Sequence, residues 1–247
     1  MRTVTVVLAA ALAATLMSAP VAAKPKLGPN ATPITIDNAY LRTAPAPDYW
    51  AFEPYNKPQF TGSACSVASL TMALNGLRGL PKKNTTKIPT QPAVLKKVGD
   101  KSWAARSAEG GSGVTFSQLR RYTREMLDAY KANASISAFH PRAADAEALA
   151  RTRQILAANE ASADSVALIY FNQGVLTGDW NGPHVSVIGA YDAATDRVLV
   201  LDVDQDWYIP YWSPVSALVD SFVKPAPKSM GVLAGQTGGI VSITKNQ

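Results

Sequence analysis

The sequence QFTGSACSVASLTMALNGL, from Gln59 to Leu77, contains the only cysteine of this 247-residue chain, and the expected fold is built around it. Apolar side chains recur there at helical spacing, at Val67, Leu70, Leu74 and Leu77. Asn75-Gly76 is a suitable end for such a helix. The pattern therefore predicts a helix that begins close to Cys65.

A cysteine in the first turn of a helix is well placed to act as a nucleophile. The unpaired amide donors and the positive end of the helix dipole favour its thiolate form. Gln59 lies six residues upstream, on a loop held by Pro58 and Gly62, and its amide can reach back towards a reacting carbonyl oxygen. The hypothesis is a cysteine acyl-transfer enzyme with Gln59 in its oxyanion hole. The alternative is a small buried side chain that only packs the helix.

The amino-terminal segment has the pattern of a secretory signal peptide. Arg2 precedes an apolar run from Val4 to Leu16, and Val21-Ala22-Ala23 resembles a cleavage site. Residues 1–23 are therefore predicted to be removed, which leaves residues 24–247 as one catalytic domain in a secreted or periplasmic location. An uncleaved membrane anchor is the competing interpretation.

Composition limits the classes of function. With 47% hydrophobic residues the chain can bury one sizeable core. One cysteine excludes disulfides within the chain, and a thiol kept in an oxidising compartment suggests a functional role. The net charge of +6 comes from scattered basic pairs, which favours anionic substrates and argues against a nucleic-acid interface.

Local patterns predict the remaining elements. Residues 24–58 are proline-rich and should run extended over the surface, with Tyr49, Trp50, Phe52 and Tyr55 either attaching this arm to the body or lining a cleft. Thr115 and Gln118 form a capping box, so a helix should follow. The other expected elements are a flexible turn at Glu109–Val114, a helix at Ala143–Asn159, a strand at Val166–Phe171, a loop at Asn172–Pro183, a hairpin of His184–Tyr191 with Arg197–Val203, and a last strand at Gly238–Thr244.

The predicted hairpin provides the partners that a nucleophilic cysteine needs. If its pairing sums to 386, His184 lies directly opposite Asp202. The imidazole would accept the Cys65 proton and return it to the leaving amine, while the carboxylate holds the ring in the correct tautomer. The residues predicted to bind substrate flank these groups: Gly62, Ser63, Ala64, Asn172, Pro183 and Tyr208.

Metal binding by side chains is not predicted. Asp202, Asp204 and Asp206 have the spacing of a calcium loop, but Trp207 stands where that loop needs glycine, and Ser213 where it needs glutamate. The second histidine, His140, has no ligand-type neighbour at suitable spacing and is interpreted as a surface residue.

These motifs also resemble known proteins. The spacing of Gln59, Cys65 and His184 resembles papain-like cysteine peptidases. More closely, Ser112–Leu119, His184–Tyr191, Val200–Val203 and Tyr208–Trp212 are similar to phytochelatin synthases, and the resemblance runs from about Tyr49 to Thr244.

The resemblance implies a papain-like α+β fold, with the cysteine helix packed on a twisted antiparallel sheet. It implies cleavage of the Cys-Gly bond of glutathione, or of a related small peptide, through a thioester on Cys65. Short bacterial relatives mainly hydrolyse that intermediate, which favours hydrolysis here. No cofactor is required, heavy-metal ions enter as thiolate complexes of the substrate or as activators, and relatives suggest a homodimer.

Three places in the sequence depart from the family pattern. Ser66 replaces a glycine after the nucleophile, Asn172-Gln173 replaces an Asn/Asp-Arg pair, and Asp204-Gln205-Asp206 replaces basic residues. Two alternatives therefore stay open: a papain-like amidase or peptidase that acts on another peptide, and a binding protein that kept the fold without activity.

Overall fold

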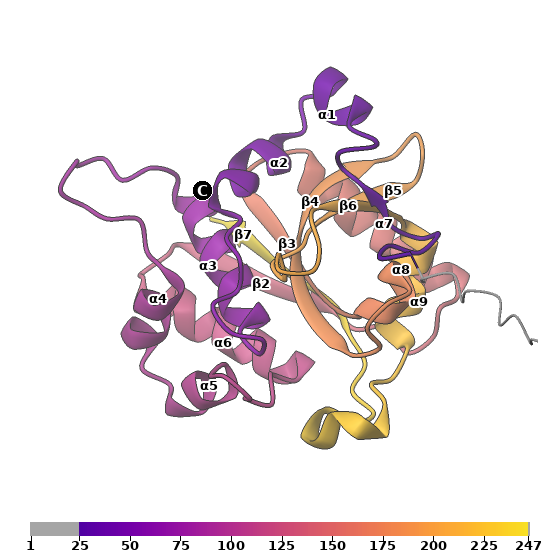
Figure 1. The fold of residues 1–247 in the computed structure, drawn as a ribbon. Helices are drawn as coiled ribbons and strands as arrows, with labels where there is room; N and C mark the ends of the chain where they lie inside the picture. Colours follow the sequence, from indigo (N-terminus) through magenta and orange to yellow (C-terminus); the bar gives the residue numbers. More distant parts are fainter. Residues whose placement is uncertain (1–24, 247) are drawn as a thin grey trace, which may run out of the picture.

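The computed structural model describes residues 25–246, so the predicted signal peptide lies outside the described residues. A single antiparallel sheet forms the centre, with strand order β1-β6-β5-β4-β3-β7-β2 (Figure 1). Its strands are β1 (Thr32–Pro33), β2 (Ala134–Phe139), β3 (Ser165–Asn172), β4 (Pro183–Asp192), β5 (Arg197–Leu201), β6 (Tyr211–Pro214) and β7 (Gly239–Lys245).

Helices cover both faces of this sheet (Figure 1). They are α1 (Ala39–Thr43), α2 (Pro47–Phe52), α3 (Cys65–Arg78), α4 (Gln91–Val98), α5 (Lys101–Arg106), α6 (Phe116–Ala129), α7 (Ala146–Glu160), α8 (Gln173–Thr177) and α9 (Val215–Val223), with 3-10 turns η1 (Glu53–Tyr55) and η2 (Lys228–Leu233). Helices α2, α3 and α6 pack on one face, and α7 and α9 on the other. Within residues 25–246, no helix is both long enough and apolar enough to cross a bilayer.

Alternation along the strands divides the core into two layers. In β3, Val166, Leu168 and Tyr170 contact the core that contains α3, whereas Ala167, Ile169 and Phe171 contact the core that contains α9. Successive side chains of a strand point to opposite faces, so a strand buried on both sides reads as one continuous apolar run. Burial on both faces explains why Val166–Phe171 was recognisable as a strand from sequence.

A β-bulge changes the register between β4 and β5. Val187 pairs with Leu201 and Ile188 with Val200, but beyond Gly189 the partner of Ala190 is Leu199. A Cβ at Gly189 would lie 2.6 Å from Leu201 Cγ, so the bulge needs a residue without a side chain there. The predicted pairing sum of 386 is therefore wrong: the pairs nearest His184 sum to 388.

Several expected boundaries differ from the structure. The cysteine helix continues past Asn75-Gly76 to Arg78, because Gly76 tolerates the close contact with α2 and Gly79 with positive φ ends the helix. The predicted helix at Ala143–Asn159 is α7, which begins at Ala146 because Asp145 caps it. The capping box of Thr115 and Gln118 is present at the start of α6.

The proline-rich arm is not extended, contrary to the expectation for residues 24–58. It contains β1, α1, α2 and η1, and Pro47 lies in the first turn of α2, where its missing amide hydrogen has no helical partner to lose. Phe52 is fully buried against the α3 layer, and Trp50 is exposed. Of the four aromatic residues predicted to attach the arm or line a cleft, none lines the large cleft described below.

Candidate active site

Cys65 is the first residue of α3 and lines a cleft of about 770 Å³. The helix is fixed to the sheet by Ser69, whose Oγ donates to the Val185 carbonyl of β4 at 3.0 Å. Ser66, which differs from the family pattern, is buried and accepts a hydrogen bond from Trp103 Nε1 at 3.0 Å. The side chain after the cysteine therefore stabilises the base of the helix, and the thiol remains accessible from the cleft.

His184 lies near the start of β4 and is almost completely buried. Its Nε2 is 2.9 Å from Asp202 Oδ1. Burial alone would lower the pKa of His184, but the Asp202 charge and hydrogen bond, together with the hydrogen bond to Cys65, raise that pKa well above its ordinary value. The structure thus brings a cysteine, a histidine and an aspartate from distant parts of the chain into one connected group.

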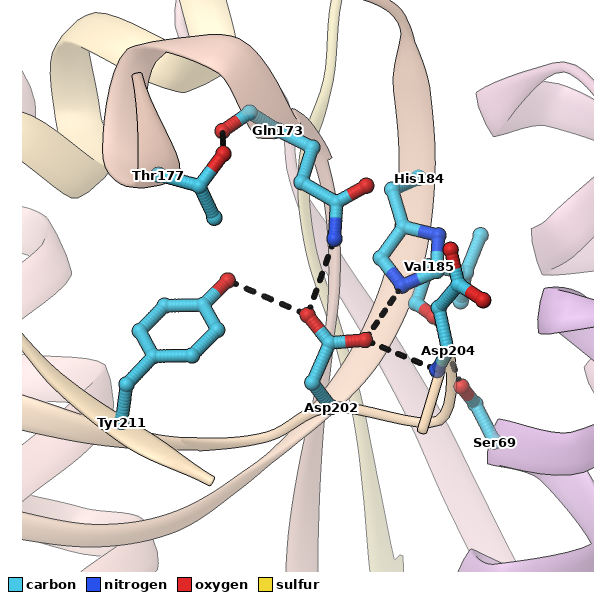
Figure 2. Close-up of polar contacts among 8 residues, drawn as sticks. All are labelled: Ser69, Gln173, Thr177, His184, Val185, Asp202, Asp204 and Tyr211. Atoms are coloured by element: carbon cyan, nitrogen blue, oxygen red, sulfur yellow. Dashed lines mark hydrogen bonds and ion pairs between the residues drawn. The ribbon is translucent and has the colours of Figure 1, made fainter. Parts of the chain in front are cut away.

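Asp202 is fully buried, and both of its oxygens accept hydrogen bonds (Figure 2). Oδ1 accepts from His184 Nε2 and from the Asp204 amide at 2.9 Å, and Oδ2 accepts from Gln173 Nε2 at 3.0 Å and Tyr211 OH at 3.2 Å. Burial would raise the pKa of Asp202, but His184, the Asp204 amide and Tyr211 lower it. A carboxylate held in this way keeps the imidazole oriented.

Sequence reasoning missed Gln173 and Tyr211. Gln173 was counted only as a departure from the family pattern, within a predicted loop, yet it begins the short helix α8 and its side chain donates to Asp202. Burial and the Asp202 charge raise the pKa of Tyr211 well above its ordinary value, so its hydroxyl keeps the proton it donates. In the sequence, Tyr211 was named only as part of Tyr208–Trp212, a segment similar to phytochelatin synthases, and its contact with Asp202 was not predicted.

The predicted contact between His184 and Asp202 is present although the predicted register was wrong by two residues, and the reason is geometric. A shift of two residues leaves every side chain on its original face of the strand, whereas a shift of one would move it to the other face. Asp202 follows the last residue of β5, and the chain turns there, with the Asp204 amide donating back to its carboxylate.

Gln59 is positioned by backbone pairing with the segment that follows Asp202. The backbone amide of Gln59 donates to the Val203 carbonyl at 2.8 Å, and Gln59 lines the cleft together with Cys65. Among residues 25–246, Gln59 Oε1 has no hydrogen-bond partner although that atom is buried. The side-chain oxygen of Gln59 is therefore not held by a hydrogen bond to another described residue.

Two loops form the wall of the cleft next to Cys65. Thr61 Oγ1 donates to the Ser107 carbonyl at 2.7 Å, and Ser63 Oγ donates to the Gly111 carbonyl at 2.6 Å. The glycine-rich segment Glu109–Val114, which was predicted as a flexible turn, is thus tied to the loop that precedes α3, and part of it lines the cleft.

The predicted substrate-binding residues divide into two groups. Gly62, Ser63, Pro183 and Tyr208 line the cleft. Ala64 and Asn172 do not. Ala64 is the fully buried N-cap residue of α3, and the Asn172 side chain caps α8 through the Gly174 amide and donates to Asn181. Asn172 therefore shapes the chain before His184 and does not face the cleft.

The charge of the cleft is opposite to that of the chain. Its lining contains four carboxylates, Glu109, Asp179, Asp204 and Asp206, and Lys26 is the one lysine or arginine among the described lining residues. The net charge of +6 had favoured anionic substrates, but a summed charge says nothing about where charges lie. The acidic lining of the cleft argues against the expectation that the substrate is anionic.

Among residues 25–246, no three His, Cys, Asp or Glu side chains are grouped so that they could hold a metal ion. In the D-x-D-x-D run, the oxygens of Asp202 already accept hydrogen bonds from His184, Gln173 and Tyr211. The other histidine, His140, is exposed, as predicted, and lies outside the cleft, with Nε2 2.8 Å from Thr237 Oγ1. Burial, helped by the charge of Arg120, lowers the pKa of His140.

Comparison with known families places this geometry in context. The family model described as phytochelatin synthase matches residues 37–230, which include α3, β3, β4 and the Asp202 turn. The chain belongs to the phytochelatin synthase family. A search of curated proteins found no match.

Membership of the phytochelatin synthase family agrees with the observed architecture. The mixed structure, with the cysteine-bearing helix packed on an antiparallel sheet, is consistent with the papain-like α+β fold of this family. The family also implies acyl-transfer or cysteine peptidase chemistry, and the family theme is glutathione, a small peptide.

Proposed function

We propose that this chain is an exported cysteine-dependent enzyme that cleaves the Cys-Gly bond of glutathione through a thioester on Cys65. The observation that carries the proposal is the connected group of Cys65, His184 and Asp202 at the edge of the cleft. The family match supports the glutathione-related theme.

Each residue has a defined part in this reaction. His184 takes the thiol proton of Cys65, and the sulfur attacks the cysteinyl carbonyl of the substrate. Gln59 provides a donor for the oxyanion, as its place beside the nucleophile suggests. The C–N bond then breaks, His184 protonates the departing glycine amine, and the γ-glutamylcysteinyl group remains on sulfur as a thioester. Water, deprotonated by His184, releases the acid and restores the thiol.

Asp202 acts through His184 and does not touch the substrate in this scheme. Its four hydrogen bonds keep the carboxylate in place, and its charge stabilises the imidazolium that forms when Cys65 loses its proton. Hydrolysis is favoured over phytochelatin synthesis because the basic residues of the family after the aspartate are replaced here by Asp204-Gln205-Asp206.

The decisive experiment follows glycine release from glutathione by the protein without residues 1–23, and traps the intermediate by acid quench and mass spectrometry. A γ-glutamylcysteinyl adduct on Cys65 in the wild type, with no glycine release by Cys65→Ser, is the expected result. Ordinary slow alkylation of Cys65 without any glycine release would favour the binding-protein alternative.

The second candidate function is that of an amidase or peptidase acting on a different peptide. The observation in its favour is the acidic lining of the cleft, since glutathione carries two carboxylates. Profiling the wild type against peptide amides of varied charge would favour this candidate if another peptide were cleaved and glutathione were not.

A further inference from the structure

The acidic residues of the cleft are concentrated on the His184 side. Asp179 and Trp180 belong to the segment before β4, while Asp204, Asp206 and Tyr208 follow β5. Asp204 is only half-buried and lies close enough to His184 for their charges to interact. The wall beside Cys65 instead contains the neutral residues Gly62 and Ser63, together with Glu109.

The chain itself shows that this side stabilises an ammonium group. Lys26 Nζ lies 2.6 Å from Asp179 Oδ2, and the same nitrogen lies 4.4 Å from the ring centroid of Trp207 and 4.7 Å from that of Tyr208. A carboxylate together with aromatic faces is a well-known environment for a cation. Trp207 is 63% exposed, so one of these faces is open to solvent.

In a thioester mechanism, this side of the cleft receives the amine. His184 protonates the leaving amine, so that amine lies beside the imidazole, and an acceptor amine must approach the thioester from the same place. Glycine would bring a carboxylate towards Asp204 and Asp206, whereas an amine with a second positive charge would be attracted by them.

We propose that the acceptor side of this cleft selects amines that carry a second, cationic ammonium group, such as a diamine, over amines that carry a carboxylate. This inference rests on the proposed thioester chemistry. The neutral nitrogen of the diamine attacks the thioester carbonyl, His184 takes the proton from that nitrogen, and the C–S bond breaks to return the Cys65 thiolate. The second nitrogen stays protonated beside Asp204 and Asp206 and forms no bond.

The test uses three amines of equal chain length that differ only at the far end: 1,4-diaminobutane, butylamine and 4-aminobutanoate. Each is added to glutathione and the wild-type protein, and mass spectrometry quantifies the γ-glutamylcysteinyl amide against the hydrolysis product. Since the amines differ in basicity, the informative quantity is the ratio of diamine to 4-aminobutanoate product compared between proteins.

We expect that ratio to fall by about three- to tenfold in the double variant Asp204→Asn/Asp206→Asn, because two partly exposed charges are removed. Asp128→Asn, which removes an exposed carboxylate on α6 outside the cleft, is the matched control and should leave the ratio unchanged. Higher ionic strength should lower the wild-type ratio.

Lys26 gives an independent measurement on a different residue. Lys26→Met removes the cation that compensates Asp179 and should raise the diamine ratio, while Lys87→Met, an exposed lysine outside the cleft, should not. If glycine release continues but the ratio is the same in all variants, or 4-aminobutanoate gains on lowering ionic strength, the amine preference is wrong and the thioester chemistry stands. Absence of any Cys65 adduct would instead overturn the proposed function.

Discussion

Asp202 and Asp48 are both fully buried carboxylates, and their surroundings differ. Asp202 faces His184 and three further donors, and burial is outweighed because His184, the Asp204 amide and Tyr211 lower the pKa of Asp202. Asp48, in the first turn of α2, has Asn159 Nδ2 of α7 as its hydrogen-bond donor, and burial raises the pKa of Asp48 to about 9. Burial alone favours the neutral acid, and a nearby cation keeps the carboxylate charged.

A neighbouring acid strengthens the contrast. Glu160 lies next to Asp48 and accepts from Tyr40 OH and the Tyr191 amide, both at 2.9 Å, yet burial still raises the pKa of Glu160 to about 7. Within residues 25–246, the hydrogen-bond donors to Asp48 and Glu160 are neutral groups, and neither acid forms an ion pair. The Asp202 carboxylate is thus kept charged beside the imidazole that the proposed chemistry needs, whereas burial favours the neutral form of Asp48 and raises the pKa of Glu160.

Removal of the cation should have the largest effect. In His184→Ala, Asp202 becomes a buried charge without its counterion, so its pKa should rise towards that of Asp48 and unfolding should become easier by about 3 kcal/mol. Glycine release should fall by at least about 10⁴-fold. Denaturant unfolding and the glutathione assay measure both, and His140→Ala, which changes the histidine outside the cleft, is the control. Normal turnover in His184→Ala would remove the imidazole from the mechanism.

Asp202→Asn should reduce turnover next most strongly. The amide keeps the shape but loses the charge that raises the pKa of His184, and it can hold the ring in the wrong tautomer, so kcat should fall by about 10²- to 10⁴-fold. The acidic limb of the pH–rate profile should move to lower pH because the imidazolium loses its counterion. Unchanged kinetics and an unchanged profile would show that Asp202 is not the orienting residue.

Asp48→Asn, at the other buried carboxylate, should change how the free energy of unfolding depends on pH. The raised pKa means that folded Asp48 keeps a proton which the unfolded chain releases above its ordinary pKa near 4. Stability is therefore lost as pH rises from about 4 towards about 9. The variant should be more stable than the wild type by about 2 kcal/mol or more near pH 8, and this gain should vanish near pH 4.

The measurement is denaturant unfolding across this pH range, with Asp128→Asn as the exposed control. A gain that is equal at all pH values would mean that titration of Asp48 is not its cause.

A pair of tyrosines provides the smallest and most specific comparison. Tyr211 OH donates to Asp202 and Tyr40 OH donates to Glu160. Either Tyr→Phe change should cost about 1 kcal/mol of stability. Only Tyr211→Phe should also reduce glycine release, by about two- to tenfold, because it loosens the carboxylate that orients His184. Equal activity of the two variants would restrict Tyr211 to a structural role.

Local sequence patterns predicted the elements whose cause is local. The capping box at Thr115 marked the start of α6, continuous apolar runs marked β3 and β4, and the cysteine in the first turn of α3 followed from helical spacing. The α1 and α2 helices in the proline-rich arm were missed because packing against the sheet, and not intrinsic preference, stabilises such short helices.

The sequence by itself determined which groups can do chemistry, because one cysteine and two histidines leave few combinations, and it predicted that Asp202 lies opposite His184. Tertiary structure decided the rest. A bulge at Gly189 set the register, α8 and β6 brought Gln173 and Tyr211 to Asp202, and chain folding gathered Asp179, Asp204 and Asp206 in the cleft of a basic chain. Hydrogen bonds and charge interactions act over a few ångströms in space, so residues far apart in the sequence acquire these roles only when the chain folds.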